Sequence, residues 1–374
     1  MERYYWTNPD VFEREVNVKA IGEHQVLIAP NLFHPNEGGQ PADRGTIGPA
    51  RVLQVNLVEG KLIHTLDQEL TEGVYLARLD RKHREHTAAQ HTAQHIISGI
   101  AERQWNLQTK GVHIGADNCT VDFDKQIDWE RAQQLERLAL DVVLMNLPVE
   151  TVFDEEDVRI RSDFKEIQAD TLRVVKIADI DKSACCGAHV ASTGQVGVIR
   201  ITDLENRKDG TRLSFLAGRK ALEFSQTETA VLRALRKSVR CATGDLPEMI
   251  QKNLDQLTHL NRQINHLWTA RLPELVETAA VIEINQSKIG IQVVDLPQKL
   301  IGKLAGMIAA SLEGAAIVVS DINIAIFSNT VDAMALFNKI QNIAGGKGGG
   351  AKQAANGKLD KTITTDQIKQ ILTE

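Results

Sequence analysis

Apolar and polar residues alternate along the first part of the chain, which is typical of strands with one buried face. The runs Gln25–Ala29 and Arg51–Val58 alternate in this way. Residues that favour turns separate such runs at positions 36–39, 43–48 and 59–60. Short strands at this spacing indicate a small barrel or sandwich. We therefore predict a β-barrel-like domain over residues 1–82.

The pattern changes after the first domain. Residues 81–102 contain no proline and have a spacing compatible with a helix. A strand is expected at Cys119–Phe123 and a second helix from about Trp129 to Met145, while residues 150–217 alternate short apolar runs with turns. Helices and strands within one segment predict an α+β domain over residues 83–218.

A helical segment follows over residues 219–272, and part of it carries a heptad pattern. Two sets of residues each recur every seven positions, which makes a coiled-coil-like seam: Ile250, Leu257 and Ile264, and Asn253, Leu260 and Leu267. We predict a helical connector over residues 219–275. The seam is compatible with an intramolecular hairpin and with a homodimer, and the sequence leaves both open.

The last part of the chain again mixes strands with helices. Strands are expected at 281–285, 290–294 and 315–319, with a helix at 299–312. This order predicts a small α/β module over residues 276–374. The fold class expected for the whole chain is α+β, with a small N-terminal β-barrel, a metal-binding α+β domain, a helical connector and a C-terminal α/β module.

Composition narrows the class of protein. The 374 residues are 43% hydrophobic and 25% charged, which is ordinary for globular domains. A net charge of −6 excludes a uniformly basic nucleic-acid binder but allows a local basic patch. Four cysteines are too few and too irregular for a disulfide scaffold. The N-terminal sequence lacks the pattern of a signal peptide and no apolar run is long enough to span a membrane, so we predict a cytoplasmic location.

Two short motifs together predict a metal site. His91 and His95 are four residues apart, so on a helix both imidazoles lie on one face. Cys185 and His189 repeat that spacing, and Gly187 between them indicates a tight turn. Three nitrogens and one thiolate suit one tetrahedral Zn²⁺, with Fe²⁺ or Co²⁺ as substitutes. Cys186 is the alternative thiolate ligand, and a solvated His-rich helix face is the alternative for the histidine pair.

The order of four motifs resembles the alanyl-tRNA editing family, meaning the editing domain of alanyl-tRNA synthetases and the freestanding AlaX proteins. The HxxxH and CxxxH motifs are preceded by residues 33–45, which look like the family's FYPxGGGQPxDxG signature with Glu37 in place of one glycine. Residues 212–222 resemble the segment that closes the editing domain, and the glycine-rich run at 345–350 looks like the DHHA1 module. The long AlaX type is the nearest pattern. Cys186-Gly187-Ala188 stands where the family more often has Gly-Gly-Thr.

The resemblance implies a zinc-dependent hydrolase that cleaves the ester between serine or glycine and tRNA(Ala). An apolar pocket sized for alanine rejects glycine and serine poorly, so a second site must remove the mischarged product. The metal, one Zn²⁺, could activate water or could anchor the substrate. Four protein ligands leave no open position, which favours anchoring and organisation of the site.

Further site residues follow from the same resemblance. Gln40 is the candidate for positioning water or substrate, and Gly38 and Gly39 are expected to allow close approach of the backbone. His113 is either a pocket residue or a core histidine. Arg212 either contacts the terminal adenosine or a phosphate, or forms a surface ion pair.

The tail predicts contacts with the tRNA partner. Lys347 and Lys352 lie in a segment with five lysines, one acid and no aromatics, which suits phosphate contacts better than base recognition. A flexible solvated loop is the alternative. Three other functions stay open: editing of a different mischarged tRNA, a non-catalytic zinc-stabilised tRNA-binding protein, and a regulatory or interaction subunit that acts through the helical segment.

Overall fold

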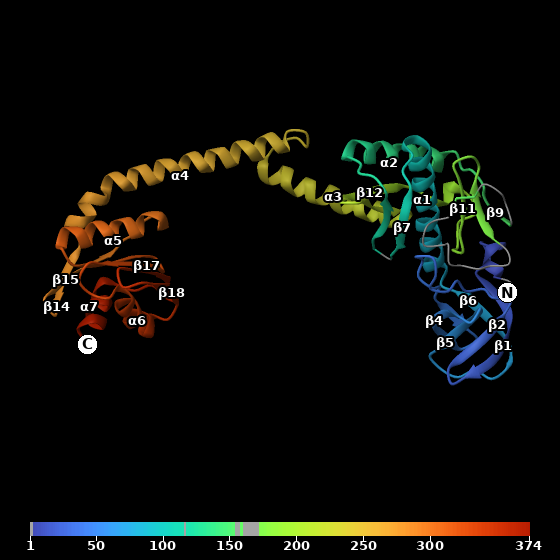
Figure 1. Ribbon diagram of the computed structural model, residues 1–374, viewed down its shortest axis with the longest axis horizontal. Helices are drawn as coiled ribbons and strands as arrows, with labels where there is room; N and C mark the ends of the chain where they lie inside the picture. Colours follow the sequence, from blue (N-terminus) through green and yellow to red (C-terminus); the bar gives the residue numbers. More distant parts are fainter. Residues whose placement is uncertain (1–2, 116, 154–157, 160–171) are drawn as a thin grey trace. The chain divides into compact units, whose positions relative to one another are not determined.

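The chain forms two compact units, residues Met1–Arg233 and Ala234–Glu374, whose boundary falls inside helix α3 (Gly218–Val239). The computed structural model describes residues 3–115, 117–153, 158–159 and 172–374 (Figure 1). Both units mix helices with sheets, as the α+β prediction requires. No helix in these ranges is both long enough and apolar enough to cross a bilayer.

Unit 1 begins with the predicted barrel. Six strands close on themselves in the order β1-β2-β5-β4-β3-β6 (Figure 1). Alternation along β1 sends Val16 and Val18 inward, where they join residues such as Val26, Ile28 and Phe33 in one apolar cluster. The barrel prediction is confirmed. Its strands are β1 (Glu13–Gly22), β2 (Gln25–Ala29), β3 (Gly45–Ile47), β4 (Ala50–Val58), β5 (Lys61–Leu66) and β6 (Gly73–Leu79).

Helix α1 (Arg81–Trp105) follows the barrel directly and carries the HxxxH motif. The Asp80 side chain caps its first turn by accepting a hydrogen bond from the backbone N–H of His83 (3.1 Å). Asn106, in the left-handed conformation, ends the helix. Nearly every residue from Thr87 to Ala101 is buried, because the helix contacts α2 and strands from two sheets.

Two sheets complete unit 1 around α1. A four-stranded sheet has the order β12-β13-β8-β7, and a three-stranded sheet has the order β11-β10-β9. Helix α2 (Trp129–Leu144) and a 3-10 turn (Thr193–Val196) pack beside α1. The strands are β7 (Thr109–Ile114), β8 (Cys119–Phe123), β9 (Val149–Phe153), β10 (Arg173–Ile177), β11 (Asp181–Ala184), β12 (Ile199–Arg207) and β13 (Gly210–Ala217).

Unit 2 is a helix-flanked sheet with the order β14-β15-β16-β17-β19-β18. One sheet face packs against α4 (Leu246–Glu277) and α5 (Gln298–Leu312). The other face packs against α6 (Ala333–Ala344) and α7 (Thr365–Thr373). The strands are β14 (Ala280–Ile284), β15 (Ser287–Val293), β16 (Ala315–Ser320), β17 (Asn323–Ser328), β18 (Lys347–Gly350) and β19 (Ala354–Lys358).

The glycine-rich run forms a β-hairpin of strands β18 and β19 in place of the irregular loop that its composition suggests. Gly348 and Gly357 lie against the ring of Phe337, and a Cβ at either position would come within 2.4 Å of ring carbons. These two glycines therefore have a packing role that the sequence alone does not reveal.

The heptad positions of α4 remain exposed within unit 2. Leu257 is 57% exposed and Leu267 is 66% exposed, and the other four seam residues are exposed as well. The described part of unit 2 therefore supplies no cover for this face.

Candidate metal centre

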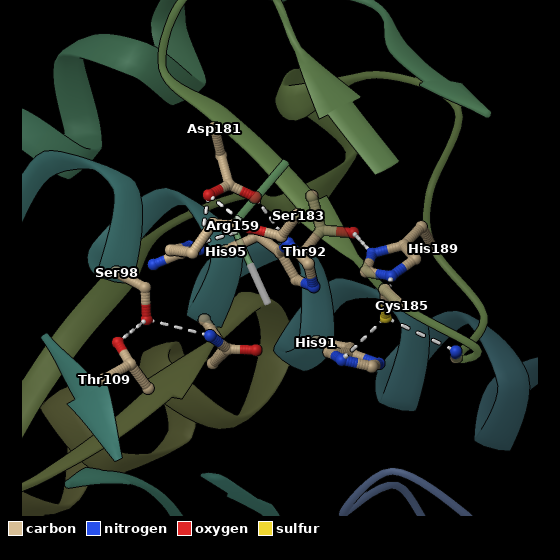
Figure 2. A network of polar contacts seen from close by, with 12 residues as sticks. His91, Thr92, His95, Ser98, Thr109, Arg159, Asp181, Ser183, Cys185 and His189 are labelled. Atoms are coloured by element: carbon tan, nitrogen blue, oxygen red, sulfur yellow. Dashed lines mark hydrogen bonds and ion pairs between the residues drawn. The ribbon is translucent and has the colours of Figure 1, made fainter. Parts of the chain in front are cut away.

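Four side chains from two distant segments converge in the interior of unit 1. His91 and His95 project one turn apart from the middle of α1, while Cys185 and His189 lie on the segment that follows β11 (Figure 2). One potential ligand atom of each lies within 4.8 Å of those of the others. All four residues, called the metal cluster below, are buried, with at most 6% of their surface exposed.

The spacing of these atoms fits a tetrahedral metal. The Sγ of Cys185 lies 3.2 Å from Nε2 of His189 and 3.5 Å from Nε2 of His91. Zinc bonds of about 2.3 Å to sulfur and about 2.0 Å to nitrogen place such ligand atoms roughly 3.5 Å apart in a tetrahedron. His91 and His189 thus present Nε2 toward the same sulfur atom.

The other ring nitrogen of each histidine is held from outside the cluster. Nδ1 of His91 lies 2.7 Å from Oε1 of Gln40, and Nδ1 of His95 lies 2.7 Å from Oδ2 of Asp181. Nδ1 of His189 lies 3.1 Å from Oγ1 of Thr92. A neutral imidazole that donates through Nδ1 keeps the Nε2 lone pair for a metal. The donor set and its supporting shell therefore fit Zn²⁺, and Fe²⁺ or Co²⁺ as substitutes.

Gly187 allows the cysteine–histidine loop to pass close to α1. A Cβ at this position would lie 2.2 Å from the His91 ring and 2.7 Å from Oε1 of Gln40. Any larger residue would displace either a candidate ligand or the group that orients it.

The peptide groups of this loop are oriented by two side chains. The guanidinium of Arg173 donates from Nη1 to the carbonyls of Cys185 (3.0 Å) and Gly187 (2.7 Å). The indole of Trp6 donates to the carbonyl between them, that of Cys186 (2.9 Å). Backbone N–H groups on the same loop point elsewhere: that of Ala188 donates to Oε1 of Gln40 (3.0 Å).

Electrostatics distinguish the two adjacent cysteines. Burial alone would raise the pKa of the Cys185 thiol, but the three surrounding histidines hold it well below its usual value. Burial raises the pKa of Cys186, and the neighbouring Cys185 raises it further. Cys185 is thus suited to be a thiolate ligand and Cys186 a buried thiol. The pairing of Cys185 with the three histidines agrees with the ligand set predicted from the spacing.

The histidines and their carboxylate also perturb one another. Burial lowers the pKa of His95, yet Cys185 and Asp181 raise it above its usual value overall. Burial would raise the pKa of Asp181, but Arg159 and His95 keep it lowered. Among the described residues His189 has no carboxylate partner of this kind, and burial holds its pKa well below the usual value.

The loop that carries Gln40 is anchored by a buried ion pair. Asp43 accepts hydrogen bonds from Nε of Arg84 (2.9 Å) and from the backbone N–H of His34 (2.6 Å). Arg84 also donates to the carbonyl of Leu32 (3.0 Å), and both charged residues are at most 3% exposed. Sequence reasoning missed this role of Arg84, although the residue lies two helical turns before His91 on the same face of α1.

Gln40 itself contacts the cluster. Its Oε1 is shared between the His91 ring and the Ala188 N–H, while its buried Nε2 has no hydrogen-bond partner among the described residues. Gly38 and Gly39 have positive φ values of 63° and 81°. A Cβ on Gly39 would lie 2.6 Å from the carbonyl oxygen of Val112, so this turn approaches β7 closely.

The remaining predicted residues lie outside the cluster. His113 is exposed on β7, so the interpretation as a core histidine is wrong. Arg212 on β13 donates from Nε and Nη2 to the two carboxylate oxygens of Asp122, each at 2.7 Å. Lys347 and Lys352 are exposed residues of unit 2, at the β18–β19 hairpin.

The solvated His-rich face does not describe the histidine pair of α1. His91 and His95 are buried, whereas His83 and His86 are more exposed and lie outside the cluster. Sequence reasoning also missed Asp181, Arg173 and Trp6. Thr92, inside the HxxxH motif, and Asp43, within residues 33–45, do lie in segments that the motifs had singled out.

Comparison with known proteins shows what the region of this site is similar to. Residues 172–213 match the family described as the second additional domain of threonyl and alanyl tRNA synthetases. The alanyl-tRNA editing protein Aarsd1 of Bos taurus is 31% identical over 63% of this chain and 54% of its own length, and that of Rattus norvegicus is 30% identical over 66% and 62%. The chain is thus similar to alanyl-tRNA editing proteins over about two thirds of its length.

The chain is also similar to part of a larger enzyme. The alanine–tRNA ligase of Methanothermobacter thermautotrophicus is 27% identical over 76% of this chain but only 33% of its own length. The chain thus spans between about a third and about three fifths of these relatives. A structure of the exonuclease RecJ bound to manganese covers 34% of the chain with 17% identity and a TM-score of 0.27, which is too low to assign any part of this fold.

Proposed function

We propose that this chain is an alanyl-tRNA editing protein, a trans-acting, zinc-dependent deacylase that hydrolyses Ser-tRNA(Ala) or Gly-tRNA(Ala). The observation that carries the proposal is the metal cluster with Gln40 at its edge. Gln40 uses its oxygen to orient His91 and keeps a buried N–H group free of partners in the described residues. A donor left unsatisfied next to a metal cluster is suited to a substrate carbonyl or to water.

The choice of serine and glycine as the esterified amino acids follows from how poorly an apolar pocket distinguishes small side chains. A site built for alanine cannot strongly exclude glycine, which lacks one methyl group, or serine, which adds one hydroxyl. Hydrolysis at a second site removes the products that the first site passes. The relatives named alanyl-tRNA editing proteins support tRNA(Ala) as the carrier of these esters.

His91, His95, Cys185 and His189 would hold one Zn²⁺. When bound, the ion would supply positive charge that anchors and polarises the substrate. Four protein ligands complete a tetrahedron, which favours this anchoring role over activation of water. Gln40 would position the ester carbonyl or the water through Nε2, and Gly38 and Gly39 would let the backbone approach the substrate.

Other residues would contact the tRNA. His113 lies on β7 next to the Gly39 turn, whose carbonyl accepts a hydrogen bond from the Ile114 N–H (2.7 Å), and we place it at the rim of the substrate site. Arg212 would contact the terminal adenosine or a phosphate, with Asp122 orienting it. Residues 276–374 of unit 2, as a DHHA1-like tRNA-binding module, would add phosphate contacts from Lys347 and Lys352. The exposed seam of α4 would support a homodimer.

A purely structural zinc site is the main alternative function. The four-ligand set is complete and buried, as structural zinc sites are, so tRNA could bind without being deacylated. The matched family description also names threonyl synthetases, which keeps a different mischarged tRNA as a further candidate.

The decisive experiment compares hydrolysis of seryl-, glycyl- and alanyl-tRNA(Ala). The purified chain is assayed with and without a chelator, beside a His95→Ala variant. We expect selective loss of the serine or glycine ester, abolished by either treatment in protein that remains folded by circular dichroism. Intact esters in all three reactions, with tRNA still bound, would refute the enzyme and leave the structural alternative.

A further inference from the structure

A cavity lies directly beside the metal cluster. Its volume is roughly 190 Å³, and His189 and Val190 form one of its walls. The N-terminal segment forms another wall through Tyr5 and Trp6. Because a candidate metal ligand lines it, the cavity and the cluster are neighbours in one continuous region of unit 1.

Arg173 places a buried positive charge in the wall of this cavity. The residue is 5% exposed, yet no carboxylate in the described part of the chain pairs with it. Its Nη1 and Nη2 donate to neutral oxygens, the latter to Oγ1 of Thr151 (3.1 Å), and its buried Nε has no acceptor among the described residues. A buried guanidinium without an anion is costly, so a site of this kind calls for a negatively charged ligand.

The surroundings do not cancel this charge. The carboxylate of Glu37 is already paired with Arg3 (2.6 Å), whose guanidinium lies over the Trp6 ring. The carboxylate of Asp181 is likewise paired with Arg159. The thiolate of Cys185 offsets only part of the charge of a divalent ion at the cluster. A metal-loaded site next to Arg173 is therefore net positive, and the hydroxyls of Tyr5 and Thr151 add neutral polar groups to the cavity wall.

We propose that this cavity is an anion subsite that receives the phosphate on the 5′ side of the terminal nucleotide of the substrate, with Arg173 as its charged residue. The identity of the substrate rests on the proposed function, but the recognition of a phosphate rests on the cavity itself. The reacting ester and this phosphate belong to the same nucleotide, so one must lie near the other. A cavity that adjoins the cluster meets that requirement.

Arg173 is a poor first variant, because its side chain also holds the cysteine–histidine loop. Thr7 offers a cleaner perturbation, since it is exposed, lines the same cavity, and its side-chain hydrogen bond in the described structure is with Asn8 and not with the cluster. Thr7→Asp adds a negative charge at the cavity, and Thr7→Asn is the matched neutral control.

The test measures binding of small probes to the zinc-loaded full chain by calorimetry, with 5′-AMP, adenosine and inorganic phosphate as ligands. We expect 5′-AMP to bind at least tenfold more tightly than adenosine or inorganic phosphate. Thr7→Asp should weaken 5′-AMP binding about 3- to 10-fold, as expected for a like charge at a partly solvated distance. Thr7→Asn should leave that binding unchanged, and zinc content should be equal in all three proteins.

Three results would overturn the subsite. Equal affinities for 5′-AMP and adenosine would show that the phosphate is not recognised. Equal affinities for 5′-AMP and inorganic phosphate would show that the nucleoside part of the ligand contributes nothing to binding. Identical binding by Thr7→Asp and Thr7→Asn would place the anion elsewhere. Because no ester is hydrolysed in this experiment, intact mischarged tRNA beside tight 5′-AMP binding would refute the proposed function and leave the subsite standing.

Discussion

Unit 1 contains two groups of buried histidines, which differ in the partners of their ring nitrogens. His91, His95 and His189 converge at the metal cluster, each with Nδ1 held by an oxygen atom. His34 and His64, in the barrel region, are both 0% exposed, and neither ring nitrogen of either residue has a hydrogen-bond partner in the described structure. Burial therefore does not mark a metal ligand, whereas an oriented Nδ1 and a shared target for Nε2 do.

The histidines of the barrel region, His34 and His64, pack as aromatic core residues. His34 packs edge-on against Tyr5 with ring centroids 5.4 Å apart, and His64 packs against Phe33 at 5.5 Å. Burial lowers the pKa of His34 to about 3 and that of His64 to about 4, so both are neutral at physiological pH. At the cluster, by contrast, thiolate and carboxylate neighbours raise the pKa of His95.

Removing a cluster histidine tests the comparison with the largest expected effect. We expect His95→Ala to weaken zinc binding by more than about 100-fold, because the metal loses one of four ligands and the Asp181 carboxylate loses its partner. Zinc per chain, measured by atomic absorption after dialysis against a weak chelator, should fall to near zero.

His64→Phe is the matched control for the histidine removal. This variant also deletes a buried imidazole in unit 1 but should retain zinc in full. Equal zinc loss in both variants would contradict the distinction between the histidines of the metal cluster and those that pack in the barrel region.

Replacing the carboxylate behind His95 should have a smaller effect. We expect Asp181→Asn to lower zinc affinity roughly 10- to 100-fold, the usual range for a group that orients a ligand. A competition titration with a chromogenic chelator measures it. Asp179→Asn is the control two residues away, since Asp179 pairs with Arg103 on the surface. Unchanged affinity in Asp181→Asn would mean that the carboxylate stabilises the fold without tuning the metal.

Acid should destabilise the barrel through its neutral histidines. Each has a folded-state pKa below its unfolded value of about 6.5, so its contribution is fully present above pH 6.5 and is lost as the pH falls toward the folded-state pKa. At pH 5 the free energy of unfolding should be lower by about 2 kcal/mol for each of the two histidines, since 1.5 pH units correspond to about 2 kcal/mol. Urea unfolding at pH 7.5 and pH 5 measures the drop.

The cluster also loses stability in acid, because protons compete with the metal for its ligands. The barrel contribution is isolated by repeating the pair of measurements in His64→Phe, where we expect the drop to shrink by about 2 kcal/mol. An unchanged drop in this variant would show that the pKa of His64 is not depressed in the folded protein.

Local patterns predicted many of the elements and singled out the four residues that the structure brings together. Alternation over residues 1–82 predicted strands that close into a barrel, and the four-residue spacing of His91 and His95 placed both rings on one face of α1, which extends to Trp105, slightly beyond the 81–102 predicted. These features depend on neighbours within a few residues along the chain, which is the range that periodicity reports.

The supporting groups could not be predicted in this way. Asp181 lies 86 residues from His95, and Trp6 lies 180 residues from the Cys186 carbonyl that it binds. No spacing rule connects partners that only the tertiary fold brings together. The hairpin β18–β19 was missed for a similar reason, since its glycines make room for Phe337 from another element.

The smallest expected effect comes from His64→Phe at pH 7.5. Phenylalanine has nearly the same shape and removes two ring nitrogens that have no hydrogen-bond partner in the described structure, so we expect stability to change by no more than about 1 kcal/mol, with a gain the favoured sign. The same exchange at His91 would remove a ligand nitrogen and should abolish zinc binding. Urea unfolding of both variants at pH 7.5 makes the comparison. A loss above about 2 kcal/mol in His64→Phe would mean that this imidazole makes a polar contact in solution, and that the barrel histidines are closer in kind to those of the cluster than their surroundings indicate.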